Sequence, residues 1–140
     1  MADAAPGPRP RPISPNIQLD GGIWRWHVTM VASILHRASG IGLYVGALVL
    51  MAWALSLAAG PGAYGEFQIL AGSLIGRLVF IGLTLCVFYH MANGVRHLAW
   101  DFGYGFKPKT ADATAWLVFG FAVVATILFW TLILTTGASA

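Results

Sequence analysis

Two histidines of one apolar segment, His90 and His97, are the side chains best suited to chemistry in this sequence. Each residue of an α-helix turns the chain by about 100°, so both histidines share a narrow stripe with Gly94 and Asp101. Ionisable side chains cost about 2.5 to 3.5 kcal/mol each inside a membrane helix, and they usually face a bundle interior or a bound cofactor. The stripe therefore indicates a functional face.

A second polar group lies on an earlier apolar segment and contains Ser33, His36 and Arg37. Ser33 and Arg37 are one turn apart and share a helix face. A hydroxyl and a guanidinium at this spacing present hydrogen-bond donors and positive charge on one side of the helix.

The rise of an α-helix places the two polar groups at one level. His36 and Arg37 follow Trp26, where the first apolar segment is expected to begin, by about ten residues, or roughly 15 Å. His90 precedes Asp101, where a second segment returns to the same side, by about eleven residues, again roughly 15 Å. Two antiparallel helices then bring six side chains to similar depths: Ser33, His36, Arg37, His90, Asn93 and Arg96.

A haem would explain why imidazole and guanidinium groups gather at this level. A helix histidine can ligate haem iron through one ring nitrogen, and we predict His90 in this role. Arg37 and a second histidine would neutralise the two propionates, whose burial without partners would be costly. Gly94, one turn from His90, would let a flat macrocycle approach the backbone. Because His90 and His97 are only about 10 Å apart along the helix axis, the spacing predicts one haem.

The composition predicts an all-α membrane protein. Hydrophobic residues make up 58% of the 140 residues and charged residues only 9%, whereas a soluble domain has about 25% charged residues.

We expect a proline-rich, extended arm with an interfacial segment at 1–27, a transmembrane domain at 28–140 and a turn at 60–66. Three transmembrane helices are too few to enclose a transport pathway, so they should form part of a heteromeric bundle. They are expected at about 28–59, 67–100 and 113–136.

The distribution of Lys and Arg predicts the orientation. These residues occur in the N-terminal arm and in the second loop, but not in the first loop or at the C-terminus. The positive-inside rule then places the N-terminus in the cytoplasm and the C-terminus in the periplasm after three crossings. The arm has no signal or transit character, which favours a bacterial inner membrane over a mitochondrial one. No basic run with interleaved aromatics indicates nucleic acid as a partner. The loop and arm cations are Arg9, Arg11, Arg25, Lys107 and Lys109.

Other interpretations of the same residues stay open. His90 could serve packing, Ser33 could bond to its own helix, and Arg37 could pair with Asp101. His97 could be a solvated residue near the surface. The polar layer as a whole could form a proton relay in a small transport subunit, or only the hydrogen bonds of a structural anchor.

Three stretches resemble the cytochrome b subunit family of succinate dehydrogenase. Ser33 to Gly40 resembles the motif S-x-x-H-R-x-S/T-G, and His90 to Asp101 resembles H-x-x-N/V-G-x-R-H-L/M-x-x-D. Arg11 to Pro15 resembles the R-P-L/I-S-P arm before the first span. Many members continue the arm as S-P-H-L-x-I-Y, whereas this chain reads S-P-N-I-Q-L-D from Ser14. This departure affects only the expected docking of the N-terminal arm, because the motif residues on the two helices are unchanged.

The resemblance implies that His90 is an axial ligand of one haem b, shared with a second small membrane-anchor subunit. It places His36 and Arg37 near the haem propionates, and we count His97 with these cofactor-binding residues. Ser33 and Arg37 would line the ubiquinone site against the iron–sulfur subunit, with the flavoprotein subunit on the same face. The chain alone would be non-catalytic, as part of a succinate:quinone oxidoreductase. A fumarate reductase anchor is the alternative within this class.

Overall fold

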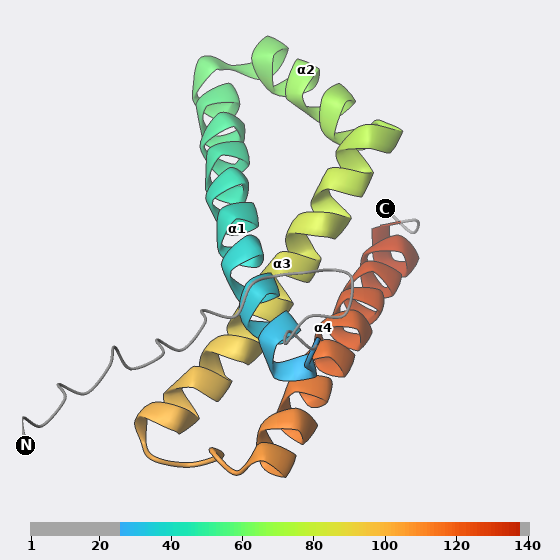
Figure 1. Ribbon diagram of the computed structural model, residues 1–140. Coiled ribbons are helices and arrows are strands. Elements are labelled where there is room, and N and C mark those ends of the chain that lie inside the picture. Colours follow the sequence, from blue (N-terminus) through green and yellow to red (C-terminus); the bar gives the residue numbers. More distant parts are fainter. Residues whose placement is uncertain (1–25, 138–140) are drawn as a thin grey trace, which may run out of the picture.

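The computed structural model describes residues 26–137, which form four helices (Figure 1). Of the expected arm at 1–27, only Trp26 and His27 lie in the described part. Three of the helices are long and apolar enough to cross a membrane, which confirms an all-α fold with three spans. At 32, 28 and 30 residues, α1, α3 and α4 measure about 48, 42 and 45 Å, longer than a hydrocarbon core of about 30 Å. The helices are α1 (Val28–Ala59), α2 (Pro61–Gly72), α3 (Leu74–Asp101) and α4 (Pro108–Gly137).

The turn expected at 60–66 is wrong, because α2 begins at Pro61. Gly60 has a φ of 108°, which favours glycine, and proline is well placed in the first turn of a helix. The helix expected to run unbroken over 67–100 is interrupted at Ser73, whose Oγ accepts a hydrogen bond from the Gly76 amide at 3.1 Å. This cap starts α3 and lets α2 bridge the diverging ends of α1 and α3, which we call the α2 end (Figure 1).

The opposite end of the bundle, which we call the His27 end, holds the start of α1, the end of α3 and the start of α4 (Figure 1). Here α4 begins at Pro108, before the expected 113, because a proline fits the first turn of a helix. The Ala111 amide donates to the Lys107 carbonyl at 2.9 Å and closes that turn. The α4 helix then runs back beside α3.

A small core forms along the seam between α3 and α4. Tyr89 stacks on Phe119 with ring centroids 5.5 Å apart, and Val118 and Ala122 are buried beside it. The Tyr89 hydroxyl donates to the Ala32 carbonyl at 2.7 Å, which ties α1 to the same seam. Many large apolar side chains of the long helices remain exposed, as expected where lipid or partner helices cover them.

The α1 and α3 helices approach closely where they cross. A Cβ atom at Gly42 would lie only 2.7 Å from Cys86 Sγ, so only glycine fits without a shift of neighbouring atoms. Small residues let helix backbones come close together in a membrane. The crossing lies next to the polar groups of both helices, so it determines how those groups meet.

Candidate functional site

Three imidazoles from two helices form one stack at the expected level. The His36 ring on α1 lies 4.0 Å from the His90 ring and 4.9 Å from the His97 ring on α3, at interplanar angles of 18° and 20°. His90 and His97 are two helical turns apart, so about 10 Å separates them along the axis and leaves room for one ring between them. The structure thus brings together His36 and His90, which the sequence placed at similar depths, and adds His97, which was expected nearer the surface.

Hydrogen bonds hold the two rings on α3. The His90 Nδ1 atom lies 3.1 Å from the Ser39 hydroxyl, which also donates to the His36 carbonyl at 2.8 Å. The His97 Nδ1 atom donates to the Asn93 carbonyl at 2.7 Å. His97 is half-buried, and its ring also contacts the Trp100 ring at a centroid distance of 5.0 Å.

Ser33 and Arg37 share one face of α1 with Gly40. A Cβ atom built on Gly40 would lie 3.4 Å from His90 Cε1, so Gly40 is where this face meets the His90 ring. The hydroxyl of the half-buried Ser33 makes no hydrogen bond within residues 26–137, so it does not bond to its own helix. From Gly40 the Ser33–Arg37 face continues along α1 toward the His27 end.

Arg37 is an exposed guanidinium without a partner in the described part of the chain. No ion pair joins it to Asp101, so the alternative in which these two residues neutralise each other is wrong for residues 26–137. A cation at this depth of a membrane helix needs a counter-charge or polar contact, because lipid cannot solvate it. Its partner must therefore come from a ligand, a neighbouring subunit or the headgroup layer.

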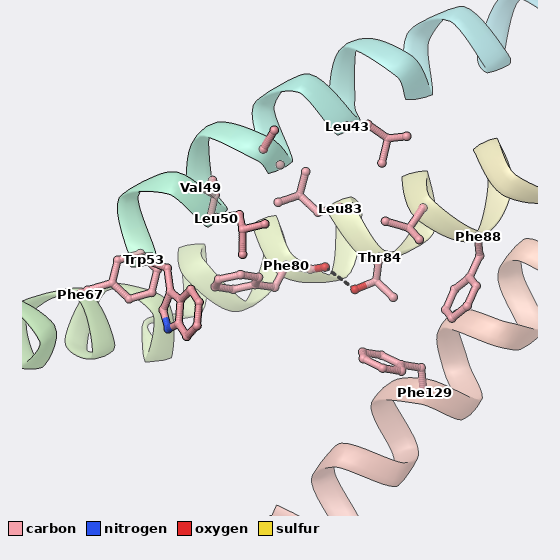
Figure 2. A pocket seen from close by; sticks show the side chains of 13 residues that line it. Leu43, Val49, Leu50, Trp53, Phe67, Phe80, Leu83, Thr84, Phe88 and Phe129 are labelled. Atoms are coloured by element: carbon pink, nitrogen blue, oxygen red, sulfur yellow. Dashed lines mark hydrogen bonds between the residues drawn. The ribbon is translucent and has the colours of Figure 1, made fainter. Parts of the chain in front are cut away.

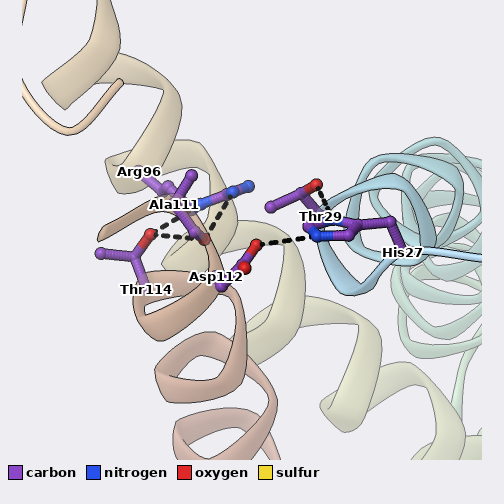
Figure 3. Close-up of polar contacts among 6 residues, drawn as sticks. All are labelled: His27, Thr29, Arg96, Ala111, Asp112 and Thr114. Atoms are coloured by element: carbon purple, nitrogen blue, oxygen red, sulfur yellow. Dashed lines mark hydrogen bonds and ion pairs between the residues drawn. The ribbon is translucent and has the colours of Figure 1, made fainter. Parts of the chain in front are cut away.

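Arg96 is at the predicted depth, but it points into the bundle. Its guanidinium donates to Thr114 Oγ1 at 3.0 Å and to the Ala111 carbonyl at 3.1 Å (Figure 3). It also contacts Asn93 Oδ1 at 3.4 Å and lies 4.1 Å from the Trp100 ring centroid. Buried and fully engaged, Arg96 joins α3 to α4 and is not available to a ligand on the α1 side.

A further contact joins the starts of α1 and α4. His27 Nε2 lies 3.4 Å from Asp112 Oδ1, and its Nδ1 lies 2.8 Å from the Thr29 hydroxyl (Figure 3). The sequence analysis did not single out Asp112, since nothing in the chain order shows that it meets His27. This pair is largely exposed, so we regard it as a structural contact near the site.

A cavity of about 790 Å³ lies toward the α2 end, and none of the residues that line it is ionisable. It opens between α1, α3 and α4, and Figure 2 shows Leu43, Leu83 and Phe129 around it. Thr84, the hydroxyl residue in its wall, donates to the Phe80 carbonyl of its own helix at 2.7 Å. The cavity suits apolar chains and offers no ligand for a metal.

The residues beside the histidine stack fit a haem. The His90 Nε2 atom makes no hydrogen bond within residues 26–137, so its lone pair is available to iron. A Cβ atom at Gly94 would meet nothing within 4 Å, so the backbone there is open to a flat group. His36 Nδ1 is buried without a hydrogen-bond partner, and Arg37 lacks a counter-charge. Both features are consistent with carboxylates supplied by a ligand.

The comparisons with known proteins agree on one family. Residues 8–129 match the family described as succinate dehydrogenase/fumarate reductase transmembrane subunit. The succinate dehydrogenase cytochrome b556 subunit of Rickettsia felis is 35% identical over 120 residues, which cover 86% of this chain and 90% of that protein. The cytochrome b556 subunit of Paracoccus denitrificans is 30% identical over 128 residues, or 91% and 94% of the two chains. The mitochondrial cytochrome b560 subunit of Sus scrofa is 39% identical over 100 residues, or 68% and 55%.

Proposed function

Because the chain belongs to the succinate dehydrogenase/fumarate reductase transmembrane subunit family, we propose that it supplies one axial ligand of a b-type haem and part of a ubiquinone site. It is a multi-pass membrane subunit of the succinate dehydrogenase complex. The observation that carries the proposal is the contact of 3.1 Å between His90 Nδ1 and the Ser39 hydroxyl of α1, while His90 Nε2 has no hydrogen-bond partner within residues 26–137.

His90 is the proposed iron ligand, and the groups around it suit the rest of a haem. Propionates would need cations and hydrogen-bond donors, which Arg37, His36 and His97 could supply. The His36 ring stacks on the His90 ring and on the His97 ring. The second axial ligand is proposed to come from a second small membrane-anchor subunit. When bound, the haem supplies a one-electron redox centre.

Ser33 and Arg37 are proposed to bind the ubiquinone head group. A hydroxyl and a guanidinium one turn apart present donors to a carbonyl oxygen, and the positive charge stabilises the negative charge that develops on reduction. Neither side chain has a partner within residues 26–137, so binding breaks no existing contact of these residues.

The Lys and Arg distribution places the His27 end on the cytoplasmic side of a bacterial inner membrane. The iron–sulfur subunit would then dock over Ser33 and Arg37 at that end, with the flavoprotein subunit beyond it. Electrons from succinate would pass from the iron–sulfur subunit to the quinone held at this face. A fumarate reductase would use the same arrangement in the opposite direction.

The ligand assignment is tested in the complete complex by a reduced-minus-oxidised absorption spectrum. His90→Ala should abolish the low-spin b-type spectrum, because the iron loses an axial ligand. His27→Ala is the matched control, since this histidine lies at the same end of the bundle but faces Asp112. An unchanged low-spin spectrum in His90→Ala, or a wild-type complex with no visible chromophore, would contradict the proposal.

A further inference from the structure

We infer that Ser39 is a positioning residue for His90, which fixes the ring so that Nε2, and not Nδ1, faces the iron. The inference rests on the proposed function, in which His90 is a haem ligand. Ser39 is 6% exposed and comes from α1, whereas the ring it holds belongs to α3. The ligand on one helix is thus oriented by a side chain of another.

A count of protons assigns the tautomer. A serine hydroxyl has one hydrogen, and that of Ser39 is donated to the His36 carbonyl at 2.8 Å. With that hydrogen engaged, the contact of 3.1 Å between Ser39 Oγ and His90 Nδ1 is satisfied when Nδ1–H is the donor, and this is the tautomer that we assign. In a neutral imidazole only one nitrogen carries a hydrogen. The Nε2 atom of His90 is therefore the one with a free lone pair.

Two further contacts from α1 restrict the orientation of the His90 ring. The His36 ring lies against its face at 4.0 Å, and the Cα of Gly40 leaves space for its Cε1 edge, where a Cβ atom would come within 3.4 Å. The hydrogen bond that His90 Nδ1–H donates to Ser39 Oγ acts at the ring edge, and the stack acts at the ring face. Together they oppose rotation of the imidazole about its two side-chain torsions.

The hydrogen bond at His97 Nδ1 differs from the one at His90 Nδ1. Its Nδ1–H also has an acceptor, but that acceptor is the Asn93 carbonyl one turn away on the same helix. A bond within one helix forms whether or not α1 is in place. The His90 bond forms only when α1 packs on α3 at the Gly42 crossing. The competent ligand therefore arises only when the two helices have assembled.

An acceptor on the far nitrogen of a ligating histidine raises the basicity of the ligating nitrogen. A more basic ligand favours ferric over ferrous iron, so the Ser39 hydroxyl should lower the midpoint potential of the haem. Loss of the hydroxyl should raise that potential. The Ser39 hydroxyl would change the midpoint potential through the basicity and orientation of the His90 ring. This change is distinct from a change in the amount of complex that assembles.

The test compares Ser39→Ala with Ser39→Thr in the purified complex, by redox titration of the haem spectrum and by EPR of the ferric state. Ser39→Ala should raise the midpoint potential by up to about 59 mV, which is a tenfold change for a one-electron couple, and shift the ferric g-values. Ser39→Thr keeps the acceptor and should give values near wild type. Thr126→Val is the control, because it removes a buried hydroxyl that bonds only to its own helix, at the Ala122 carbonyl.

The outcomes separate the inference from the proposed function. Unchanged potential and g-values in Ser39→Ala, in a complex that loses its low-spin spectrum with His90→Ala, would overturn the role of Ser39 and leave the ligand assignment standing. Equal shifts in Ser39→Ala and Ser39→Thr would also overturn it, because the hydroxyl would then not be the cause. A low-spin spectrum that survives His90→Ala would refute the proposed function itself.

Discussion

At the scale of single residues, the polar side chains available to a ligand are those that lack a partner in their own chain. Arg37 and the Nε2 atom of His90 have none within residues 26–137, whereas Arg96, at similar depth, is fully engaged. The sequence showed all three at one level but could not distinguish them. The distinction depends on the direction in which each side chain points around its helix.

Arg37→Ala should lower succinate–ubiquinone turnover about 100-fold, because one donor to a developing oxyanion is lost. Succinate oxidation with a water-soluble artificial acceptor should stay near wild type, since that reaction does not need the quinone site. Steady-state assays with the two acceptors provide the measurement.

The matched control for Arg37 is Arg77→Ala, which removes another exposed arginine, at the α2 end of α3. Both activities should be retained in this variant. If Arg37→Ala lowered both activities equally, the residue would serve assembly and not the quinone.

Arg96→Met should reduce the stability of the complex while the haem potential stays unchanged. The substitution removes the donor to Thr114 Oγ1 and to the fully buried Asn93 Oδ1, while the Ala111 carbonyl still accepts from the Thr114 hydroxyl. An unsatisfied buried polar group costs about 1 to 3 kcal/mol. A thermal melt followed by loss of the haem spectrum, paired with a redox titration, measures both quantities. A large potential shift at unchanged stability would show that Arg96 acts on the haem and not on the α3–α4 seam.

At the scale of helices, depth could be predicted from sequence because the rise per residue is constant. The rotation of one helix against another could not be predicted from sequence, because it depends on which small residues permit the two helices to approach closely. Ser39 stood in a recognised motif, yet only the crossing of α1 and α3 shows that it bonds to His90. The break at Ser73 also escaped prediction, because the apolar pattern continues through it and only its cap to Gly76 marks the new helix.

Gly42→Ala should weaken haem retention by separating α1 from α3. The new Cβ atom would meet Cys86 Sγ at 2.7 Å, and overpacking of this kind costs about 1 to 3 kcal/mol. The haem content per complex after detergent extraction is the measurement.

Cys86→Ala, added to Gly42→Ala, should restore haem retention, because it removes the sulfur atom that the new methyl group meets. Gly120→Ala is the control, since a Cβ atom there meets nothing within 4 Å. Failure of the double variant to recover would show that the crossing distance is not what limits haem binding.

At the scale of the whole molecule, the three long helices leave one side of the α1–α3 pair open. The α4 helix packs along α3 through Tyr89 and Phe119, whereas the histidine stack and Arg37 lie away from that seam. A chain that exposes so much apolar surface together with an unpaired cation is built to be completed by other subunits. The number of spans could be read from hydropathy, whereas partner subunits could be expected only from the family resemblance, because hydropathy does not distinguish a lipid-facing surface from a subunit contact.

The orientation of the chain in the membrane is testable with single cysteine substitutions in a Cys86→Ala background. Glu66→Cys lies at the α2 end and Lys107→Cys at the His27 end, and both positions are exposed. If the His27 end is cytoplasmic, a membrane-impermeant maleimide should label Glu66→Cys in intact spheroplasts and Lys107→Cys only after lysis. The reverse pattern would invert the proposed topology.

The most direct test of the central claim compares His90→Ala with His97→Ala in the assembled complex by low-temperature absorption and EPR spectroscopy. Both rings stack on His36 and both have an acceptor at Nδ1, so the two substitutions are closely matched. We predict that His90→Ala loses the low-spin haem signal and that His97→Ala keeps it with at most a shifted potential. Retention of the signal in His90→Ala, or its loss only in His97→Ala, would contradict the account.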